Sequence, residues 1–553
     1  MRDGVRLDTH CWLPVQAVQG KPAPAILLRT PYRESTMGFK RLGVLRYVEA
    51  GYAVVIQLVR GTGDSEGRFA FAAPHERSDG FDTVEWIAQQ SWCSGAVGMD
   101  GSSYAAMTQL AAAVARPPHL RCIAPAVPVL DHFREVPYFG GVFSRQHTLN
   151  WPRLLQIDDL SNLTGGFSGA KTMLGNEQVL DRLLSRPLCD AADGMLEGDF
   201  LAHYREVLEH PRLDDWWRER TIGPDEFAAI DIPALVVNGN FDLAIGTLML
   251  WRGLEQHAPA AERQLLIGPW DHGQCYAGGA ASHGPYTLGD ASVLDLGGLR
   301  LAFFDRHLKG SGDGLPWRER VRLFVTGRNS WQGLDAFPPR ELRTQTWYLD
   351  SGGQANSSSG DGRLQRGLPS GPPDRFIDDP AVPFVPALAS AREPAGHFDL
   401  REREQHHGTL VYDSGPLAEP MTVVGEPLAE LLVAADVPDA DLVLWLAEHR
   451  ADGQTIKLAF GQLRLRYRDG FEQERALVPD EPVLARVPMT YIGHELPAGS
   501  RLRLLVSGSN FPWADPNPHD GGPVAQATVM RVARQTMLHD AAHPSRLLLP
   551  TLP

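Results

Sequence analysis

The stretch that decides the fold reads Gly98-Met99-Asp100-Gly101-Ser102-Ser103-Tyr104-Ala105-Ala106, and it lies between a short apolar run and a helical pattern over residues 104–115. It matches Gly-x-Ser-x-small, with Ala105 in the last place. Such a strand-to-helix turn projects the serine hydroxyl beyond the sheet and aims the next backbone N–H, that of Tyr104, at a developing oxyanion. The match alone is weak, because either serine could instead cap the helix. The phase of the motif favours Ser103 and leaves Ser102 as the alternative.

Two later strand ends supply an acid and a base. Asp242 follows the apolar run 234–238, and His272 follows the run 264–268. Open parallel sheets gather functional groups at the carboxyl ends of their strands, and the order Ser, Asp, His is that of the α/β-hydrolase triad. We therefore predict that His272 takes the proton of Ser103 while Asp242 orients the imidazole. Asp271 is a rival acid, but it adjoins the histidine on the same strand end.

Apolar runs alternate with helical patterns in the first third of the chain and again after residue 230. This alternation predicts a parallel sheet covered by helices on both faces. The expected strands are 25–28, 53–59, 96–99, 122–126, 234–238 and 264–268, and the expected helices are 79–90, 104–115 and 296–308.

The rest of the chain has a different character. Short helical pieces fill residues 130–230, whereas β patterns with one polar face follow residue 339 and predict a β-sandwich. The stretch 352–373 is rich in Gly, Ser and Pro and predicts a long loop. We therefore expect an α/β-hydrolase domain in two parts, 1–129 and 231–338, a helical cap over 130–230, and an all-β domain over 339–553.

Composition narrows the function classes. A chain of 553 residues is too long for one core, and its formal charge of −15 disfavours nucleic acid and anionic membranes as partners. No apolar run reaches the roughly 18 residues that span a bilayer, and no signal peptide is visible, so we expect a cytoplasmic protein. The five cysteines are odd in number and lack metal-ligand spacing, so we expect no disulfide framework. The motifs of the chain imply no metal or organic cofactor.

Several motifs together resemble the cocaine esterase and X-Pro dipeptidyl-peptidase family of serine hydrolases. The matching segments are MRDGVRL (1–7), RTPY (29–32), RGTGDSEG (60–67), EWIAQQSWCSG (85–95), GSSY (101–104), GPWDH (268–272), YDSGPL (412–417) and SNFP (509–512). The resemblance spans nearly the whole chain and is weakest in the helical insertion. It implies a hydrolase domain with an inserted cap and a C-terminal jelly roll, and it carries the triad onto Ser103, Asp242 and His272.

The resemblance also implies an oxyanion donor. The family uses a tyrosine hydroxyl, and its motif falls on Tyr32, which follows the strand 25–28 where an α/β-hydrolase supplies its second donor. Aromatic residues of the cap could form an apolar wall over the serine, or could equally be the cap's own core. The candidate substrate-binding residues are Tyr138, Phe143, Trp151 and, at the pocket border, Trp270.

The triad does not decide the leaving group. A carboxylic ester with a medium-sized, partly apolar acyl group is our first hypothesis, and an X-Pro peptide or other amide is the second. The amide reading needs a carboxylate for the substrate's ammonium. The resemblance implies that the amino-acid ester hydrolase branch of the family places such carboxylates shortly after the triad acid, but here Leu243-Ala244-Ile245 follow Asp242. The remaining candidates are Asp131, Glu135, Asp158 and Asp159 of the cap. A third hypothesis is a non-catalytic glycan-binding module. The physiological substrate and homo-oligomer formation remain open.

Overall fold

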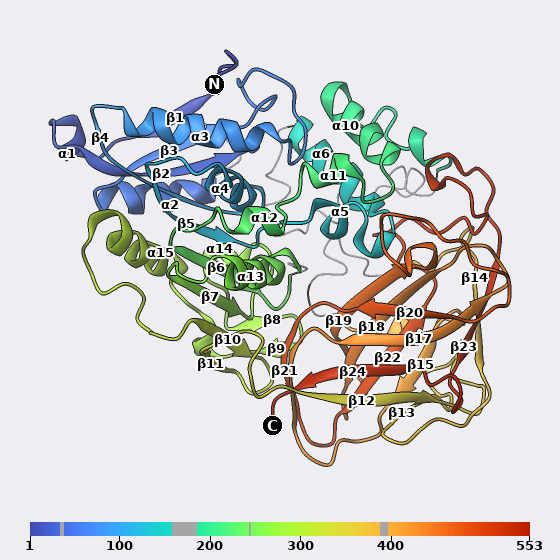
Figure 1. Ribbon diagram of the computed structural model, residues 1–553. Coiled ribbons are helices and arrows are strands. Elements are labelled where there is room, and N and C mark those ends of the chain that lie inside the picture. Colours follow the sequence, from blue (N-terminus) through green and yellow to red (C-terminus); the bar gives the residue numbers. More distant parts are fainter. Residues whose placement is uncertain (34–37, 158–184, 243–244, 387–395, 397) are drawn as a thin grey trace.

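The computed structural model describes the chain except for residues 34–37, 158–184, 243–244, 387–395 and 397. Figure 1 shows an α/β region in blue and green, a helical region beside it, and an all-β region in orange and red. In the described part of the chain, no helix is long and apolar enough to cross a bilayer.

A mixed, mainly parallel sheet forms the α/β region. Its strands lie in the order β1-β3-β2-β4-β5-β6-β7-β10-β11. The edge strands β1 and β11 pair antiparallel with their neighbours, and the strands between are parallel. Their bounds are β1 Thr9–Trp12, β2 Ala23–Thr30, β3 Ala53–Leu58, β4 Cys93–Ser102, β5 Leu120–Ala126, β6 Ala234–Gly239, β7 Arg263–Gly268, β10 Val321–Val325 and β11 Ser330–Leu334. The six predicted strands are confirmed, and β10 and β11 extend the sheet beyond them.

Helices cover both faces of this sheet, as near-continuous apolar strands require. Alternate residues of β2 enter different cores: Ala25 and Leu27 pack with α3, α4 and α13, whereas Ile26 and Leu28 pack with α2, α14 and α15. The helix bounds are α1 Val15–Val18, α2 Gly38–Glu49, α3 His75–Ala88, α4 Tyr104–Val114, α13 Ile245–His257, α14 Gln274–Ala277 and α15 Leu296–Phe304. The helix expected over 296–308 continues past α15 as a π-helical turn, Asp305–Lys309.

The helical cap lies between β5 and β6 in sequence. Its described helices are α5 His132–Glu135, α6 Arg145–Ile157, α10 Gly198–Glu209, α11 Asp215–Arg218 and α12 Pro224–Phe227. It has a core of its own, built around Phe133, Tyr204 and Trp217.

The C-terminal region is an all-β structure around one large apolar core, and its strands pair antiparallel except for the parallel pair β13 and β15. Its strands are β12 Arg343–Asp350, β13 Arg363–Gln365, β14 Asp374–Asp378, β15 Leu410–Asp413, β16 Met421–Gly425, β17 Leu428–Ala435, β18 Asp441–His449, β19 Thr455–Arg464, β20 Val483–Pro488, β21 Ile492–Leu496, β22 Arg501–Ser507, β23 Ala533–Leu538 and β24 Arg546–Thr551. The predicted loop 352–373 is interrupted by β13, which pairs with β12 and β15. The short helix α16 (Arg401–Glu404) precedes β15.

Buried ion pairs join the cap to the all-β region. Asp515 is fully buried and accepts from Arg145 at the start of α6 (3.1 Å) and from Arg186 (2.9 Å). The Gln462 side chain of β19 also donates to the Phe139 carbonyl (2.8 Å). These contacts fix the helix α6, which lies against the predicted active site.

Candidate active site

Ser103 occupies the turn between β4 and α4 with φ 59° and ψ −122°. This is a strained conformation for a non-glycine residue and is typical of a functional turn. The turn closes tightly, because a Cβ on Gly101 would lie 2.5 Å from the Ala105 Cβ. Ser102 instead continues β4 and pairs with Ala126. The Ser103 hydroxyl makes no capping hydrogen bond to α4, so the helix-cap alternative is not supported.

The predicted acid and base are joined by a hydrogen bond. Asp242 follows β6 and His272 follows β7, and the Asp242 Oδ2 lies 2.6 Å from the His272 Nδ1. The loops approach closely, since a Cβ on Gly239 would lie 2.1 Å from the Trp270 carbonyl. A carboxylate at Nδ1 favours the tautomer with its proton there, which leaves Nε2 as the basic nitrogen. The rival Asp271 accepts the Gln274 N–H at 2.9 Å and so shapes the turn into α14.

Tyr32 lies just after β2, and its hydroxyl accepts a hydrogen bond from the Trp151 indole N–H at 3.0 Å. Burial raises the pKa of Tyr32, so the phenol stays protonated at neutral pH and can donate. Tyr104 begins α4, where the first backbone N–H groups have no acceptor within the helix. The chain thus offers one side-chain donor and one backbone donor for an oxyanion.

Trp151 of α6 is the centre of an aromatic wall. Its ring stacks on Tyr104 with centroids 6.1 Å apart and an angle of 16°. Phe71 meets it edge-on at 5.1 Å, and Phe69 lies 6.1 Å away. The wall is therefore built from the cap and from loops of the α/β region, and its residues are partly or fully buried.

The other three candidate substrate-binding residues lie in cores. Tyr138 and Phe143 belong to the cap core, where the Tyr138 hydroxyl donates to the Val207 carbonyl at 3.1 Å. Trp270 is completely buried among the residues beneath β7 and donates to the Ser292 carbonyl at 3.2 Å. These three residues therefore pack in hydrophobic cores, which is the alternative that the sequence left open. The spacing of aromatic residues in a short segment does not distinguish a core residue from one that lines a substrate pocket.

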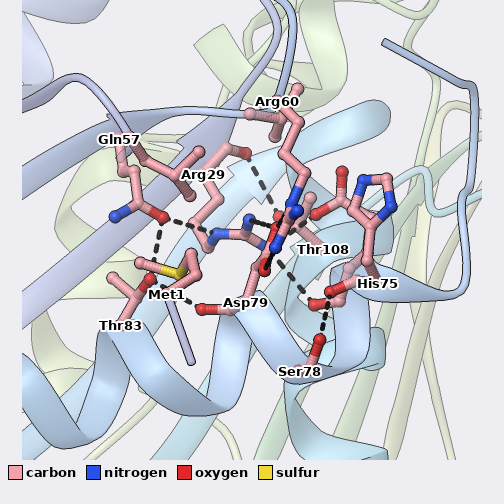
Figure 2. Close-up of polar contacts among 12 residues, drawn as sticks. Met1, Arg29, Gln57, Arg60, His75, Ser78, Asp79, Thr83 and Thr108 are labelled. Atoms are coloured by element: carbon pink, nitrogen blue, oxygen red, sulfur yellow. Dashed lines mark hydrogen bonds and ion pairs between the residues drawn. The ribbon is translucent and has the colours of Figure 1, made fainter. Parts of the chain in front are cut away.

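Arg29, Arg60 and Asp79 lie together in a buried polar network (Figure 2). The Tyr104 hydroxyl donates to Glu76 at 2.8 Å, and Arg29 donates to the same carboxylate at 2.6 Å. Arg60 binds the neighbouring Asp79 through two hydrogen bonds of 2.7 Å. Burial and the nearby Glu76 carboxylate raise the pKa of Tyr104 far above its ordinary value. The network holds the residue that follows the serine, and sequence reasoning missed Arg29 and Glu76 in this role.

His147 is a second residue that sequence reasoning missed. It lies one helical turn before Trp151 on α6, and the two rings are stacked at 6.1 Å with an angle of 11°. Burial, together with the nearby charge of His272, lowers the pKa of His147 to about 4. It is therefore neutral at physiological pH. The sequence signal that could have identified His147 is its position four residues before Trp151, which places both side chains on one face of a helix.

Two of the proposed ammonium-binding acids have structural partners. The partly buried Glu135 carboxylate accepts backbone N–H groups from Leu130, Asp131 and Gly246, each at 2.7 Å. Burial raises the pKa of Glu135 to about 8. Asp131 caps α5 and pairs with Arg134. Asp158, Asp159, Leu243 and Ala244 lie outside the described residues.

Over the described ranges, no group of three or more His, Cys, Asp or Glu side chains could hold a metal ion.

The fold and the strained serine turn define an α/β-hydrolase. The family model "X-Pro dipeptidyl-peptidase (S15 family)" matches residues 3–274, and the model "X-Pro dipeptidyl-peptidase C-terminal non-catalytic domain" matches residues 317–548. The cocaine esterase of Rhodococcus sp. (strain MB1 Bresler) is 30% identical over 591 residues, covering 100% of this chain and 97% of the relative. The chain therefore belongs to the S15 family of X-Pro dipeptidyl-peptidases and is a serine hydrolase.

Solved structures agree on the fold. An aminopeptidase from a marine sediment Thaumarchaeota archaeon superposes with a TM-score of 0.82 at 24% identity, covering 100% of this chain and 95% of that one. An α-amino acid ester hydrolase gives a TM-score of 0.80 at 24% identity with the same coverage. Both similarities extend over the α/β region, the cap and the all-β region.

Proposed function

We propose that this serine hydrolase cleaves carboxylic esters through an acyl-enzyme on Ser103. The observation that carries the proposal is the backbone of Ser103, which is held at φ 59° between β4 and α4 with its hydroxyl not used as a helix cap. A protein keeps such strain where the serine has to stand clear of the sheet. The hydrogen bond between Asp242 and His272 supplies the base that a serine nucleophile needs.

The chemistry follows in two halves. His272 Nε2 takes the Ser103 proton as the hydroxyl attacks the ester carbonyl, and Asp242 stabilises the imidazolium that forms. The Tyr32 hydroxyl and the Tyr104 N–H receive the developing oxyanion. The imidazolium then protonates the leaving alcohol. In the second half water attacks the acyl carbonyl while His272 takes its proton, and the imidazolium returns that proton to the Ser103 oxygen as the acid is released.

The aromatic wall supports a partly apolar substrate. Trp151, Tyr104 and Phe71 present ring faces and edges close to the Tyr32 hydroxyl. Such a surface favours an acyl group of aliphatic or aromatic character. Of the four residues predicted to bind substrate, Trp151 is the one that we retain.

An X-Pro dipeptidyl-peptidase or amide acylase is the second candidate, because the family model bears that name. It would need a carboxylate for the substrate's ammonium. Asp131 and Glu135 are both committed to holding α5 and the start of α13, which favours the ester reading. Rates on alanyl-proline p-nitroanilide and on p-nitrophenyl butyrate, measured side by side, separate the two: a higher kcat/KM on the anilide would reverse our preference.

Paired serine variants test the nucleophile. Ser103→Ala should abolish p-nitrophenyl butyrate hydrolysis, whereas Ser102→Ala should retain it, because Ser102 is a residue of β4. The two serines are adjacent, and each substitution removes one hydroxyl group. Comparison of the two variants therefore separates a loss of catalysis from a loss of folding. Full activity of Ser103→Ala would refute the proposal.

A further inference from the structure

We propose that Asp100 is a positioning residue, which ties the segment that carries His272 to the turn that carries Ser103. The inference rests on the proposed function, because it takes Ser103 as the nucleophile and His272 as its base. It goes beyond that function by assigning a role to a fully buried carboxylate of β4 that takes no part in the proposed proton transfers.

One oxygen of Asp100 is bonded to the serine turn. The Asp100 Oδ1 accepts the Gly101 N–H at 2.8 Å. Gly101, with φ 136°, lies where β4 approaches the start of α4, since a Cβ there would lie 2.5 Å from the Cβ of Ala105. Ser103 follows two residues later in its strained conformation. The carboxylate therefore holds the backbone from which the nucleophile projects.

The other oxygen of Asp100 reaches the segment of the base. The Asp100 Oδ2 accepts the Tyr276 hydroxyl at 3.3 Å. Tyr276 lies on α14, four residues after His272. The intervening turn is closed by Asp271 and Gln274, which exchange two hydrogen bonds of 2.9 and 3.1 Å. Because this turn is fixed by its own hydrogen bonds, a constraint on Tyr276 is also a constraint on His272.

Arg300 of α15 holds Tyr276 against the carboxylate. The Arg300 Nη2 donates to the Tyr276 carbonyl at 2.8 Å, and the guanidinium carbon lies 4.1 Å from the centroid of the Tyr276 ring. The Arg300 Nε forms an ion pair with the Asp100 Oδ2 at 3.6 Å, and both side chains are almost completely buried. Arg300 thus contacts the backbone of Tyr276, its ring and the carboxylate that accepts its hydroxyl.

The surroundings of Asp100 show why a carboxylate there needs an explanation. Tyr47 of α2 also donates to the Asp100 Oδ2, at 2.8 Å, and its ring packs edge-on against Phe304 in an apolar cluster. A charge buried in such a place loses its hydration, whereas an apolar side chain would not. What the carboxylate adds is a pair of acceptors, one for the nucleophile turn and one for the segment of the base. Burial raises the pKa of Tyr276 and of Tyr47, so both phenols stay protonated and donate.

Removal of the Tyr276 hydroxyl tests the inference. His272 can take the Ser103 proton only within hydrogen-bond reach, and a misplacement of about 1 Å can cost about 10²-fold in rate. Tyr276→Phe cuts the link to Asp100 and keeps the ring beneath Arg300. We expect kcat for p-nitrophenyl butyrate to fall about tenfold. KM should change little, because the aromatic wall is not altered.

Tyr47→Phe is the matched comparison. It removes the shorter hydrogen bond to the same carboxylate oxygen, but it does so from α2, which carries neither Ser103 nor His272. Tyr47→Phe should therefore lower the urea midpoint at least as far as Tyr276→Phe and lower kcat by less than about threefold. Equal falls in kcat for the two variants, or a fall below about threefold for Tyr276→Phe, would overturn the inference.

A second control lies on the same face of the sheet. The Tyr52 hydroxyl donates to Asp305 at 2.8 Å, away from both catalytic segments. Tyr52→Phe should leave kcat unchanged. A fall in kcat as large as that of Tyr276→Phe would show that any lost phenol in this cluster slows the enzyme, and the inference would be wrong.

A double variant tests whether Tyr276 acts through Asp100. If it does, adding Tyr276→Phe to Asp100→Ala should cause no further fall in kcat, because the link is already cut. Independent roles would instead multiply the two falls, which would contradict the inference. Should Asp100→Ala not fold, the comparison of Tyr276→Phe with Tyr47→Phe decides alone.

Failure of the proposed function looks different. If the chain is not an esterase that uses Ser103, the wild-type protein would not hydrolyse p-nitrophenyl butyrate, or Ser103→Ala would still do so. A wild-type protein that needs Ser103 but loses no kcat in Tyr276→Phe would leave the proposed function standing and refute only the role of Asp100.

Discussion

The Tyr32 hydroxyl can be removed with little change of shape by Tyr32→Phe. If Tyr32 donates to the oxyanion, its loss removes an interaction that is strongest in the transition state, so kcat should fall while KM changes little. Removal of one oxyanion donor typically costs about 10²–10³ in kcat, or about 2.7–4 kcal/mol. We expect a fall of that size for p-nitrophenyl butyrate.

The structure also sets the accompanying cost in stability. The variant leaves the Trp151 indole N–H without its 3.0 Å acceptor. A buried donor that loses its partner costs about 1–3 kcal/mol of unfolding free energy. Urea unfolding would measure that loss separately, so a fall in kcat can be assigned to catalysis only in samples shown to be folded.

Tyr104→Phe is the matched comparison. Tyr104 is proposed to donate through its backbone N–H, which phenylalanine keeps, while its hydroxyl bonds the buried Glu76. This variant should therefore lose stability, by about 1–3 kcal/mol, with a much smaller fall in kcat than Tyr32→Phe. If Tyr32→Phe kept more than half of the wild-type kcat, the assignment of Tyr32 as an oxyanion donor would be wrong.

Three other predictions concern orientation, burial and pH. Asp242→Asn should lower kcat by about 10⁴-fold, because an amide favours the wrong imidazole tautomer; a fall below tenfold in steady-state assays would contradict this. Arg29→Met should cost about 3–5 kcal/mol in urea unfolding, since the buried Glu76 carboxylate keeps no cation at 2.6 Å; no loss would contradict it. Burial lowers the pKa of His132 to about 3 in the fold. The unfolded chain therefore binds a proton there below about pH 6.5 and the folded chain does not, so stability should fall with pH between about 6.5 and 3, by up to about 1.4 kcal/mol per pH unit. His132→Gln should reduce that slope in urea titrations at stepped pH, and an unchanged slope would refute it.

The parallel sheet could be predicted because its strands are apolar on both faces. Runs such as Ala53–Leu58 are fully buried, and each is followed by a helix or a loop with a distinct composition. Ser103, Asp242 and His272 stand out for the same reason, since each follows such a run. Element boundaries shifted by a few residues, and β13 was missed because a three-residue strand in a Gly- and Ser-rich stretch carries little periodicity.

The wall of the site could not be predicted, because it depends on contacts between distant segments. Trp151 is hydrogen-bonded to Tyr32, which lies 119 residues away in the sequence. Glu76 is hydrogen-bonded to Tyr104, which lies 28 residues away. Tyr138 and Phe143 have the same aromatic character as Trp151 yet lie in the cap core. The placement of α6, whose first residue Arg145 is held by Asp515 of the all-β region, decides which aromatic residue lies beside Tyr32 and Tyr104.

Covalent labelling tests the central claim most directly: that one strained serine, raised above the sheet, performs the chemistry. A fluorophosphonate probe followed by peptide mass spectrometry should place a single adduct on Ser103, and Asp242→Asn should slow its formation. An adduct on Ser102 or on another residue, with Ser103 unmodified, would contradict the account.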